Sequence, residues 1–379
     1  MQLPPLSLYV HIPWCVRKCP YCDFNSHEQK AELPESQYVE ALLKDLAADA
    51  AMAQGRPLES IFIGGGTPSL FSGAAIGRIL DGARELIGFA DKCEITMEAN
   101  PGTIEHDSFK AYREAGVTRL SLGVQSFGTE QLKALGRIHD RTQAEMAAAQ
   151  ALSAGFDSVN LDLMHGLPGQ TPELALADIM QAADLAPPHL SWYQLTIEPN
   201  TQFYSKPPTL PQDEALWQIF DEGQARMQSL GYRQYEVSAW AQPGMECQHN
   251  LNYWKFGDYL GIGCGAHGKL TDPSGNRILR TEKIKHPKGY LQAIDYRRDV
   301  KPIAEQELPL EYLMNRARLL EAIPKAEYQA YTGLSWRSLS QKLAPAAQRG
   351  LLSENQAHWQ LTDKGQLFVN EILGLLVED

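Results

Sequence analysis

The chain has 379 residues, of which 44% are hydrophobic and 21% charged, a composition typical of a globular protein with one large core and a second, smaller one. Its 34 basic and 46 acidic side chains give a net charge of −12, so the surface as a whole repels nucleic acid and anionic lipid. No apolar run of about eighteen residues is present to span a bilayer, and the N-terminus lacks a signal-peptide pattern. We therefore expect a cytoplasmic protein that does not bind nucleic acid.

Strands alternate with helices over the first 200 residues. Six apolar, β-favouring runs of strand length are separated by helical patterns, and they span residues 6–12, 58–63, 93–98, 119–124, 158–163 and 189–196. Alternation at this spacing predicts parallel strands joined by right-handed crossovers. Because eight such units are needed to close a barrel, we predict an α/β fold with a partial (β/α)6 barrel of TIM-like type.

Three cysteines follow the first predicted strand in a Cys-x3-Cys-x2-Cys pattern: Cys15, Cys19 and Cys22. A zinc site would need a fourth ligand, and a ferredoxin run would supply a fourth cysteine nearby. Three thiolates on a four-iron cluster would instead leave one iron open to a substrate or cofactor. A zinc loop or disulfides are the alternative, but the irregular cysteine spacing and the missing signal peptide argue against secretion.

Polar and glycine-rich residues also follow the other predicted strands. In parallel α/β folds the reactive groups gather at the carboxyl ends of the strands, so these residues are expected on one rim. Residues 64–67 form a glycine loop that we expect to offer backbone N–H donors to a ligand. Glu98, Gln125 and Asp162 can accept hydrogen bonds from an ammonium group or ribose hydroxyls, and Arg137 can hold a carboxylate.

The cysteine pattern, with an aromatic residue just before its last cysteine, resembles the signature of radical S-adenosylmethionine (SAM) proteins. The resemblance implies a [4Fe-4S] cluster on the three cysteines. The open iron would bind SAM, and an electron from the cluster can cleave SAM to a 5′-deoxyadenosyl radical. It further implies SAM contacts at ten positions: Tyr9, Tyr21, Gly65, Gly66, Thr67, Glu98, Gln125, Arg137, Asp162 and Thr196.

The pattern changes after residue 200, where several prolines mark a connection. We expect three domains: the barrel over 1–200, an extension over 201–300, and a small helical or winged-helix-like α+β domain over 301–379. Within the extension, residues 214–230 are predicted to be a helix and residues 232–240 a single strand. Residues 277–301 carry eight cations against three anions, which is either a solvated surface or a docking patch for carboxylates or a membrane-bound partner.

Longer motifs resemble the oxygen-independent coproporphyrinogen III oxidase superfamily over essentially the whole chain. They are Gly-Gly-Gly-Thr-Pro, Gly-Val-Gln-Ser-Phe and Asp-Leu-Met-His-Gly-Leu-Pro-Gly-Gln. True oxidases of that superfamily carry a further cysteine two residues beyond the triplet, where this sequence has Phe24, and a long N-terminal extension. Residues 249–254, His-Asn-Leu-Asn-Tyr-Trp, match instead the His-Asn-x-x-Tyr-Trp motif of the heme chaperone family HemW. That resemblance implies a chaperone without oxidase activity that passes heme to apo-cytochromes, including respiratory membrane enzymes.

The residue types of this motif suit heme. His249 is a candidate axial ligand of the iron, while Tyr253 and Trp254 offer flat apolar area to a porphyrin face. The alternative is an aromatic core packed beside the barrel. We expect the propionates to reach basic side chains of residues 277–301. A membrane-bound recipient would place the docked protein at the inner membrane.

Cluster state or SAM occupancy is then expected to set either homodimer formation or heme release, and whether SAM is cleaved stays open. The competing hypothesis is a radical SAM oxidoreductase that acts on a tetrapyrrole. A plain iron-sulfur scaffold is a third hypothesis, and it would leave the SAM rim unexplained.

Overall fold

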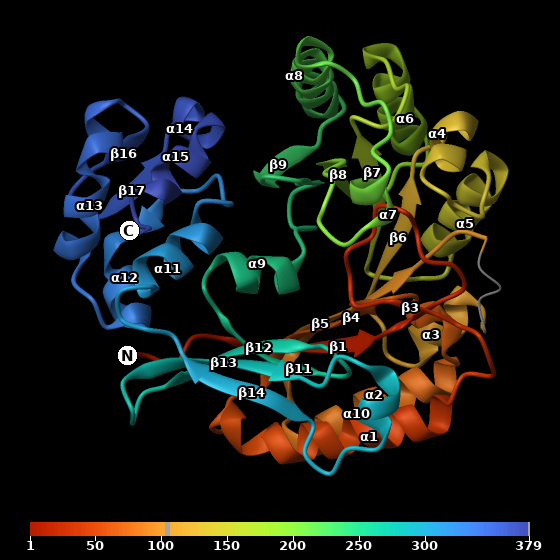
Figure 1. Cartoon of the computed structure of the whole chain (residues 1–379), viewed down its shortest axis with the longest axis horizontal. Helices are drawn as coiled ribbons and strands as arrows, with labels where there is room; N and C mark the ends of the chain where they lie inside the picture. Colours follow the sequence, from red (N-terminus) through yellow and green to blue (C-terminus); the bar gives the residue numbers. More distant parts are fainter. Residues whose placement is uncertain (103–106, 378–379) are drawn as a thin grey trace.

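The computed structural model describes residues 1–102 and 107–377. Six parallel strands form the centre of one twelve-stranded sheet (Figure 1). In sheet order they are β1 (Leu6–Ile12), β4 (Leu58–Gly65), β5 (Phe89–Ala99), β6 (Arg119–Gln125), β7 (Ser158–His165) and β8 (His189–Gln194). Almost every residue of β1 and β6 is buried, as expected for parallel strands covered on both faces. The predicted α/β fold with an open, six-unit parallel core is confirmed.

Helices follow the strands as the alternation predicts. They are α1 (Glu35–Asp49), α2 (Gly73–Leu86), α3 (Phe109–Glu114), α4 (Thr129–Ala134), α5 (Arg141–Ser153) and α6 (Pro172–Asp184), with 3-10 turns η1 (Ala50–Ala53) and η2 (Pro68–Leu70). Side chains placed one residue before the helix fix several starts. Ser72 accepts from the N–H of Ala75 and Thr171 from that of Leu174, which satisfies donors that have no partner within the helix.

The sheet continues on both sides of the parallel core. Beside β1 it adds one parallel strand, β11 (Asp258–Ile262), and then three antiparallel strands: β12 (His267–Asp272), β13 (Arg277–Lys283) and β14 (Arg297–Pro302). Beside β8 it adds β10 (Ala239–Ala241) and β9 (Arg233–Glu236). Residues far apart in the sequence thus complete the wall next to the first strand.

The single strand predicted over residues 232–240 is wrong. The segment is a hairpin of β9 and β10, in which Trp240 pairs with Gln234. The Glu236 carboxylate accepts the N–H of Ser238 at 3.1 Å and closes the turn. Alternating apolar and polar residues continue through this turn, which made it look like one extended run.

The remaining helices of the middle part are α7 (Gln202–Ser205), α8 (Asp213–Ser229), α9 (Gln248–Trp254) and α10 (Pro287–Leu291). The C-terminal elements lie apart from the parallel strands in Figure 1. They pack around a second hydrophobic core, which includes Tyr312, Tyr328 and Trp359. They are α11 (Leu308–Arg316), β15 (Ile323–Pro324), α12 (Lys325–Thr332), α13 (Trp336–Gln348), β16 (Leu352–Glu354), β17 (His358–Leu361), α14 (Asp363–Leu367) and α15 (Val369–Gly374). The domain limits at 200 and 300 stay predictions. Within the described part of the chain, no helix is both long and apolar enough to span a membrane.

Candidate functional site

The cysteine loop is closed and anchored by its own side chains. Its two ends pair as short parallel strands, β2 (Trp14–Cys15) and β3 (His27–Glu28). Lys18 Nζ donates to the carbonyls of Phe24 and Ser26 at 3.0 and 3.2 Å. Asn25 Nδ2 donates to the carbonyls of Cys264 and Lys285, both at 2.9 Å, and so ties the loop to the distant β11–β13 wall.

The loop brings the three cysteines to one cavity at the carboxyl ends of the strands, which we call the cluster cavity. Its lining includes most of the predicted rim: Cys15, Cys19, Tyr21, Cys22, Gly65, Gly66, Thr67, Gln125, Arg137 and Thr196. Among residues 1–102 and 107–377, no three His, Cys, Asp or Glu side chains converge as a preformed site for a single metal ion. A cubane cluster does not require that convergence, because each thiolate binds a different iron.

The thiols fit such a cluster in type and position. Burial raises the pKa of Cys15 to about 11 and also raises that of Cys22. Both side chains are therefore protonated at neutral pH without a metal, and metal binding would release their protons. Arg137 Nη1 lies 3.6 Å from Cys19 Sγ, so a cation stands beside the sulfur of this cysteine.

The glycine loop differs from expectation in its hydrogen bonding. The N–H groups of Gly66 and Thr67 donate to the carbonyls of Ile12 and Trp14, both at 2.7 Å, and that of Gly65 donates to Glu98 Oε2 at 3.1 Å. These donors are therefore used within the protein and not offered to a ligand. Glycine is required because a Cβ on Gly65, whose φ is +111°, would lie 2.4 Å from the His11 ring, and one on Gly66 would lie 2.5 Å from the Trp14 carbonyl.

The two carboxylates of the rim occupy different places. Glu98 lies beside Gly65, and burial together with the charge of Asp162 raises the pKa of Glu98 to about 7. Asp162 accepts hydrogen bonds from Ser121 Oγ at 3.0 Å and Asn160 Nδ2 at 2.8 Å. It lines neither the cluster cavity nor the cavity next to it, so it supports the rim from behind.

Arg137 and Gln125 are held in place by hydrogen bonds. Arg137 Nη2 donates to Asn100 Oδ1 at 2.5 Å and to the Gly123 carbonyl at 2.7 Å. Gln125 has a positive φ of 69° at the end of β6, and its Oε1 accepts from the Tyr193 hydroxyl at 2.8 Å. Sequence reasoning missed Tyr193, although its position near the carboxyl end of β8 is the same signal that found the other rim residues.

A second cavity of about 790 Å³ adjoins the cluster cavity, and we call it the outer cavity. The two cavities share the lining residues Asp23, Phe24, Ser26 and Gly65. Other residues of the outer cavity come from β1, β5, β11, β12 and the segment after β13: Tyr9, His11, Glu98, Tyr259, His267 and Lys285. Phe24 is 61% exposed on the shared wall. A volume of this size suits a ligand of drug or cofactor dimensions.

The predicted heme motif forms α9, and its three aromatic residues point in different directions. Tyr253 lines the outer cavity and packs edge-on against Tyr259 with ring centroids 4.5 Å apart. Trp254 lies under the guanidinium of Arg318 at 4.3 Å and lines neither cavity. Of the three residues proposed for heme, only Tyr253 reaches the open space.

His249 is 0% exposed and faces the barrel. Its Nδ1 lies 3.0 Å from Ser60 Oγ, and its ring packs against Phe62 with centroids 5.2 Å apart. Burial lowers its pKa to about 3, so the imidazole is neutral. Nε2 is buried and has no hydrogen-bond partner among the described residues. This placement differs from the expected open heme face, because iron cannot reach the ring unless α9 moves.

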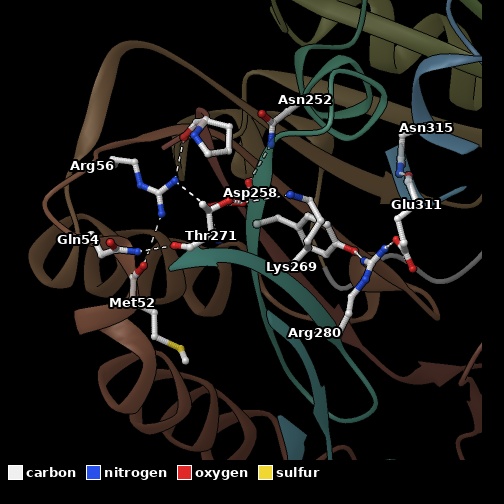
Figure 2. A network of polar contacts seen from close by, with 12 residues as sticks. Met52, Gln54, Arg56, Asn252, Asp258, Lys269, Thr271, Arg280, Glu311 and Asn315 are labelled. Carbon is white, nitrogen blue, oxygen red and sulfur yellow. Dashed lines mark hydrogen bonds and ion pairs between the residues drawn. The ribbon is translucent and has the colours of Figure 1, made fainter. Parts of the chain in front are cut away.

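A buried polar network holds α9 against the sheet (Figure 2). Asn252 Nδ2 donates to the Asp258 carbonyl at 2.9 Å. The Asp258 carboxylate pairs with Arg56 at 2.8 Å and with Lys269 at 3.1 Å, and it also accepts from the Thr271 N–H at 2.8 Å. The amide of Asn252 therefore ties the end of the heme motif to β11, and charge-assisted hydrogen bonds to the Asp258 side chain hold that part of the wall together.

The basic stretch over residues 277–301 is mostly paired, which narrows the predicted docking patch. Lys283 is fully buried between Asp45 and Asp49, and Arg280 pairs with Glu311. Further pairs are Arg277 with Asp272, Arg297 with Asp49, Arg298 with Glu282, and Lys301 with Asp299. Lys285 alone of the stretch lines the outer cavity, so the expectation that several of its cations meet the propionates is not supported by their positions.

Comparisons with known proteins agree with this site. A model of the radical SAM superfamily matches residues 9–180, and a model of the HemN C-terminal domain matches residues 303–368. Fold and site thus define a protein of the radical SAM class. The solved structure of coproporphyrinogen III oxidase (HemN) from Escherichia coli, described as a radical SAM enzyme, superposes with a TM-score of 0.83 at 26% identity and covers 99% of this chain and 90% of that one.

The relatives identify the family. Heme chaperone HemW of Escherichia coli (strain K12) is 57% identical over 381 residues, which cover 100% of both chains. Heme chaperone HemW of Haemophilus influenzae is 54% identical over 382 residues and covers 100% of this chain and 99% of the relative. The chain belongs to the heme chaperone HemW family, as its motifs predict.

Proposed function

We propose that this protein is a heme chaperone, which binds heme and passes it to apo-hemoproteins such as respiratory cytochromes, on a scaffold that holds a [4Fe-4S] cluster and SAM. The main structural support for this proposal is the wall that the two cavities share. The cluster cavity contains the cysteine triplet, and the outer cavity contains Tyr253 of the HemW motif. Full-length identity of 57% to a relative named heme chaperone HemW supports the proposal.

In this proposal, the cluster cavity binds the resident cofactors. Cys15, Cys19 and Cys22 hold the cluster, which supplies an electron and an open iron when bound. Arg137 is oriented by Asn100 and the Gly123 carbonyl, so its free edge suits a carboxylate. Glu98 accepts from the ammonium group of SAM, and that cation would favour its ionised form. The remaining proposed SAM contacts are Tyr9, Tyr21, Gly65, Gly66, Thr67, Gln125 and Thr196, and Asp162 supports the rim behind them.

Heme occupies the outer cavity in this proposal. Tyr253, Tyr259 and Phe24 give it flat aromatic surface, and the volume of about 790 Å³ suits a porphyrin. His249 and Trp254 support Tyr253 in the structure as it stands, through ring contacts at 4.7 and 6.3 Å respectively. For His249 to bind iron itself, α9 would have to leave Ser60.

The recipient and the association state extend the same proposal. We expect a membrane-associated apo-cytochrome to dock the protein peripherally at the inner membrane, with the free protein in the cytoplasm. Cluster or SAM binding is proposed to set either homodimer formation or heme release, and the second follows from the wall that the cluster cavity shares with the outer cavity. Light scattering of apo, cluster-loaded and SAM-loaded samples tests the first alternative, and equal mass in all three would contradict it.

The function is tested by anaerobic heme titration of cluster-reconstituted protein, followed by transfer to an apo-cytochrome. We expect saturation near one heme per chain and a heme signal in the recipient after separation. A variant with all three cluster cysteines changed to alanine reports whether the cluster is required, and Cys93→Ala is its matched control. Failure of the wild type to saturate, or to transfer heme, overturns the proposal.

The similarity to coproporphyrinogen III oxidase, at a TM-score of 0.83, supports a second candidate, a radical SAM oxidoreductase of tetrapyrroles. Its test is anaerobic turnover of coproporphyrinogen III with SAM and a reductant. We expect none, since Phe24 stands where the oxidases carry their further cysteine. Product formation together with 5′-deoxyadenosine would establish the oxidoreductase instead.

A further inference from the structure

The outer cavity has three histidines in its lining, and a fourth, His249, lies behind its wall. An iron ligand needs an accessible imidazole with an uncommitted nitrogen. His11 is 5% exposed, and its two ring nitrogens lie 3.0 Å from the Tyr9 hydroxyl and from the Asn25 carbonyl. His249 is fully buried. Neither of these two rings can meet a ligand in the structure as it stands.

The other two lining histidines differ in what they bind. His27 is half-buried, and its Nε2 lies 3.3 Å from Asn25 Oδ1. His267, the first residue of β12, is exposed, and neither of its ring nitrogens has a hydrogen-bond partner within the described residues. Partial burial lowers the pKa of His267, so the ring is neutral and has a lone pair available at neutral pH.

The backbone at His267 is rigidly placed. It pairs across the sheet with Glu282 of β13, and a Cβ on Gly261 would lie 2.0 Å from the His267 carbonyl. Such close approach of β11 and β12 fixes where the imidazole leaves the sheet. The side chain therefore projects into the cavity from a strand and not from a mobile loop, which favours a defined ligand geometry.

Two lysines stand in the lining of the same cavity. Lys18 Nζ lies between the carbonyls of Phe24 and Ser26, where it also holds the cysteine loop. The Lys285 side chain is 57% exposed, and its Nζ lies 3.0 Å from the Glu282 carboxylate. The same carboxylate also pairs with Arg298 at 2.9 Å. Because Glu282 is shared by two cations, the local charge stays positive beside His267. A carboxylate of a bound ligand would be attracted there.

We propose that His267 provides the imidazole that ligates heme iron in the outer cavity, and that Lys285 binds one propionate. This inference rests on the proposed heme chaperone function and deepens it. A ring nitrogen of His267 donates its lone pair to the iron in place of a weakly held ligand such as water. Tyr253 and Tyr259, on the neighbouring wall, then meet the macrocycle.

The test uses the full-length, cluster-reconstituted chain under anaerobic conditions with ferric and ferrous heme. Resonance Raman spectra excited in the Soret band report the iron–imidazole bond and separate it from cluster absorption. We expect His267→Ala to lose this band and His267→Gly to regain it when free imidazole is added. His286→Ala is the matched control, an exposed histidine that does not line the outer cavity, and should leave the band unchanged.

A second experiment tests the contact between Lys285 and a propionate by comparing the binding of heme with the binding of its dimethyl ester. We expect Lys285→Ala to weaken heme binding about two- to fivefold, the range of an exposed ion pair, and to leave ester binding unchanged. Equal loss for both ligands would remove Lys285 from the proposal.

If both His267 variants keep the iron–imidazole band and His249→Ala loses it, His267 is not the iron ligand. The chaperone function would still stand in that case. A wild type that binds no saturating heme would overturn both. Far-UV circular dichroism and thermal unfolding confirm that each variant is folded.

Discussion

Ser60 Oγ lies 3.0 Å from His249 Nδ1 and 2.7 Å from Ser7 Oγ, so a chain of buried hydrogen bonds joins the HemW motif to β4 and β1. All three side chains are fully buried. The histidine that the motif offers as an iron ligand is therefore also part of the core. Loss of heme binding in a His249 variant would have two explanations, and a stability measurement separates them.

We predict that His249→Ala lowers the free energy of unfolding by about 2–4 kcal/mol, because it removes a packed ring and leaves Ser60 with one partner fewer. Urea unfolding at pH 7 measures the change. His286→Ala, an exposed histidine that caps α10, should cost no more than about 1 kcal/mol, the range of a lost helix cap. An unchanged midpoint for His249→Ala would mean that the ring does not support the fold.

Acid lability is predicted at His165, whose ring stacks on Trp192 with centroids 4.0 Å apart. Burial lowers its pKa to about 4, against about 6.5 in the unfolded chain. Above pH 6.5 the ring is neutral in both states. As the pH falls from 6.5 toward 4, only the unfolded state gains the proton, so stability drops by about 1.4 kcal/mol per pH unit for this group.

The variant His165→Phe removes that titration and should lose less stability than the wild type between pH 7 and 5. Asp178, whose pKa is raised to about 6 by burial, contributes with the opposite sign. Because both proteins contain Asp178, its effect cancels in the comparison. Urea unfolding at the two pH values measures the difference, and equal losses would contradict the prediction.

Asp258 is the centre of the network in Figure 2, and we predict that Asp258→Asn is strongly destabilising. The side chains of its partners Lys269 and Arg56 are only 3% and 13% exposed. The substitution therefore leaves two buried cations without the carboxylate that compensates their charge. The expected loss is about 3–5 kcal/mol by urea unfolding. Asp221→Asn, on the exposed face of α8, is the control and should be near neutral. A small loss for Asp258→Asn would show that water compensates the cations.

Phe24 is predicted to contribute to heme binding, because its exposed ring stands on the wall that the two cavities share. We expect Phe24→Ala to weaken heme affinity roughly three- to tenfold, in line with the contribution of one aromatic contact. Phe24→Tyr should retain it. Trp217→Ala, which removes an aromatic ring that is 56% exposed outside both cavities, is the control for nonspecific binding of heme to apolar surface. Equal affinity in all three variants would place heme elsewhere.

Local patterns were enough to predict most of the parallel core. The limits of β1 agree with the sequence-based expectation, since an apolar run between two prolines is set by neighbouring residues. The rim followed from one topological rule, which gathered Cys15, Thr67 and Arg137 at the same cavity. The hairpin at 233–241 was missed because its turn depends on one side-chain contact, from Ser238 to Glu236.

The direction of side chains outside the parallel core was decided by tertiary contacts. The motif at 249–254 identifies the family, yet only packing against Phe62 and Ser60 turns His249 inward while Tyr253 faces the outer cavity. Likewise, Lys283 looks like a surface cation in the sequence but neutralises two buried carboxylates of α1. Sequence periodicity records which residues share a face of one element. Which face meets which neighbour depends on β11 to β14 folding back beside β1, a pairing between residues more than 200 positions apart.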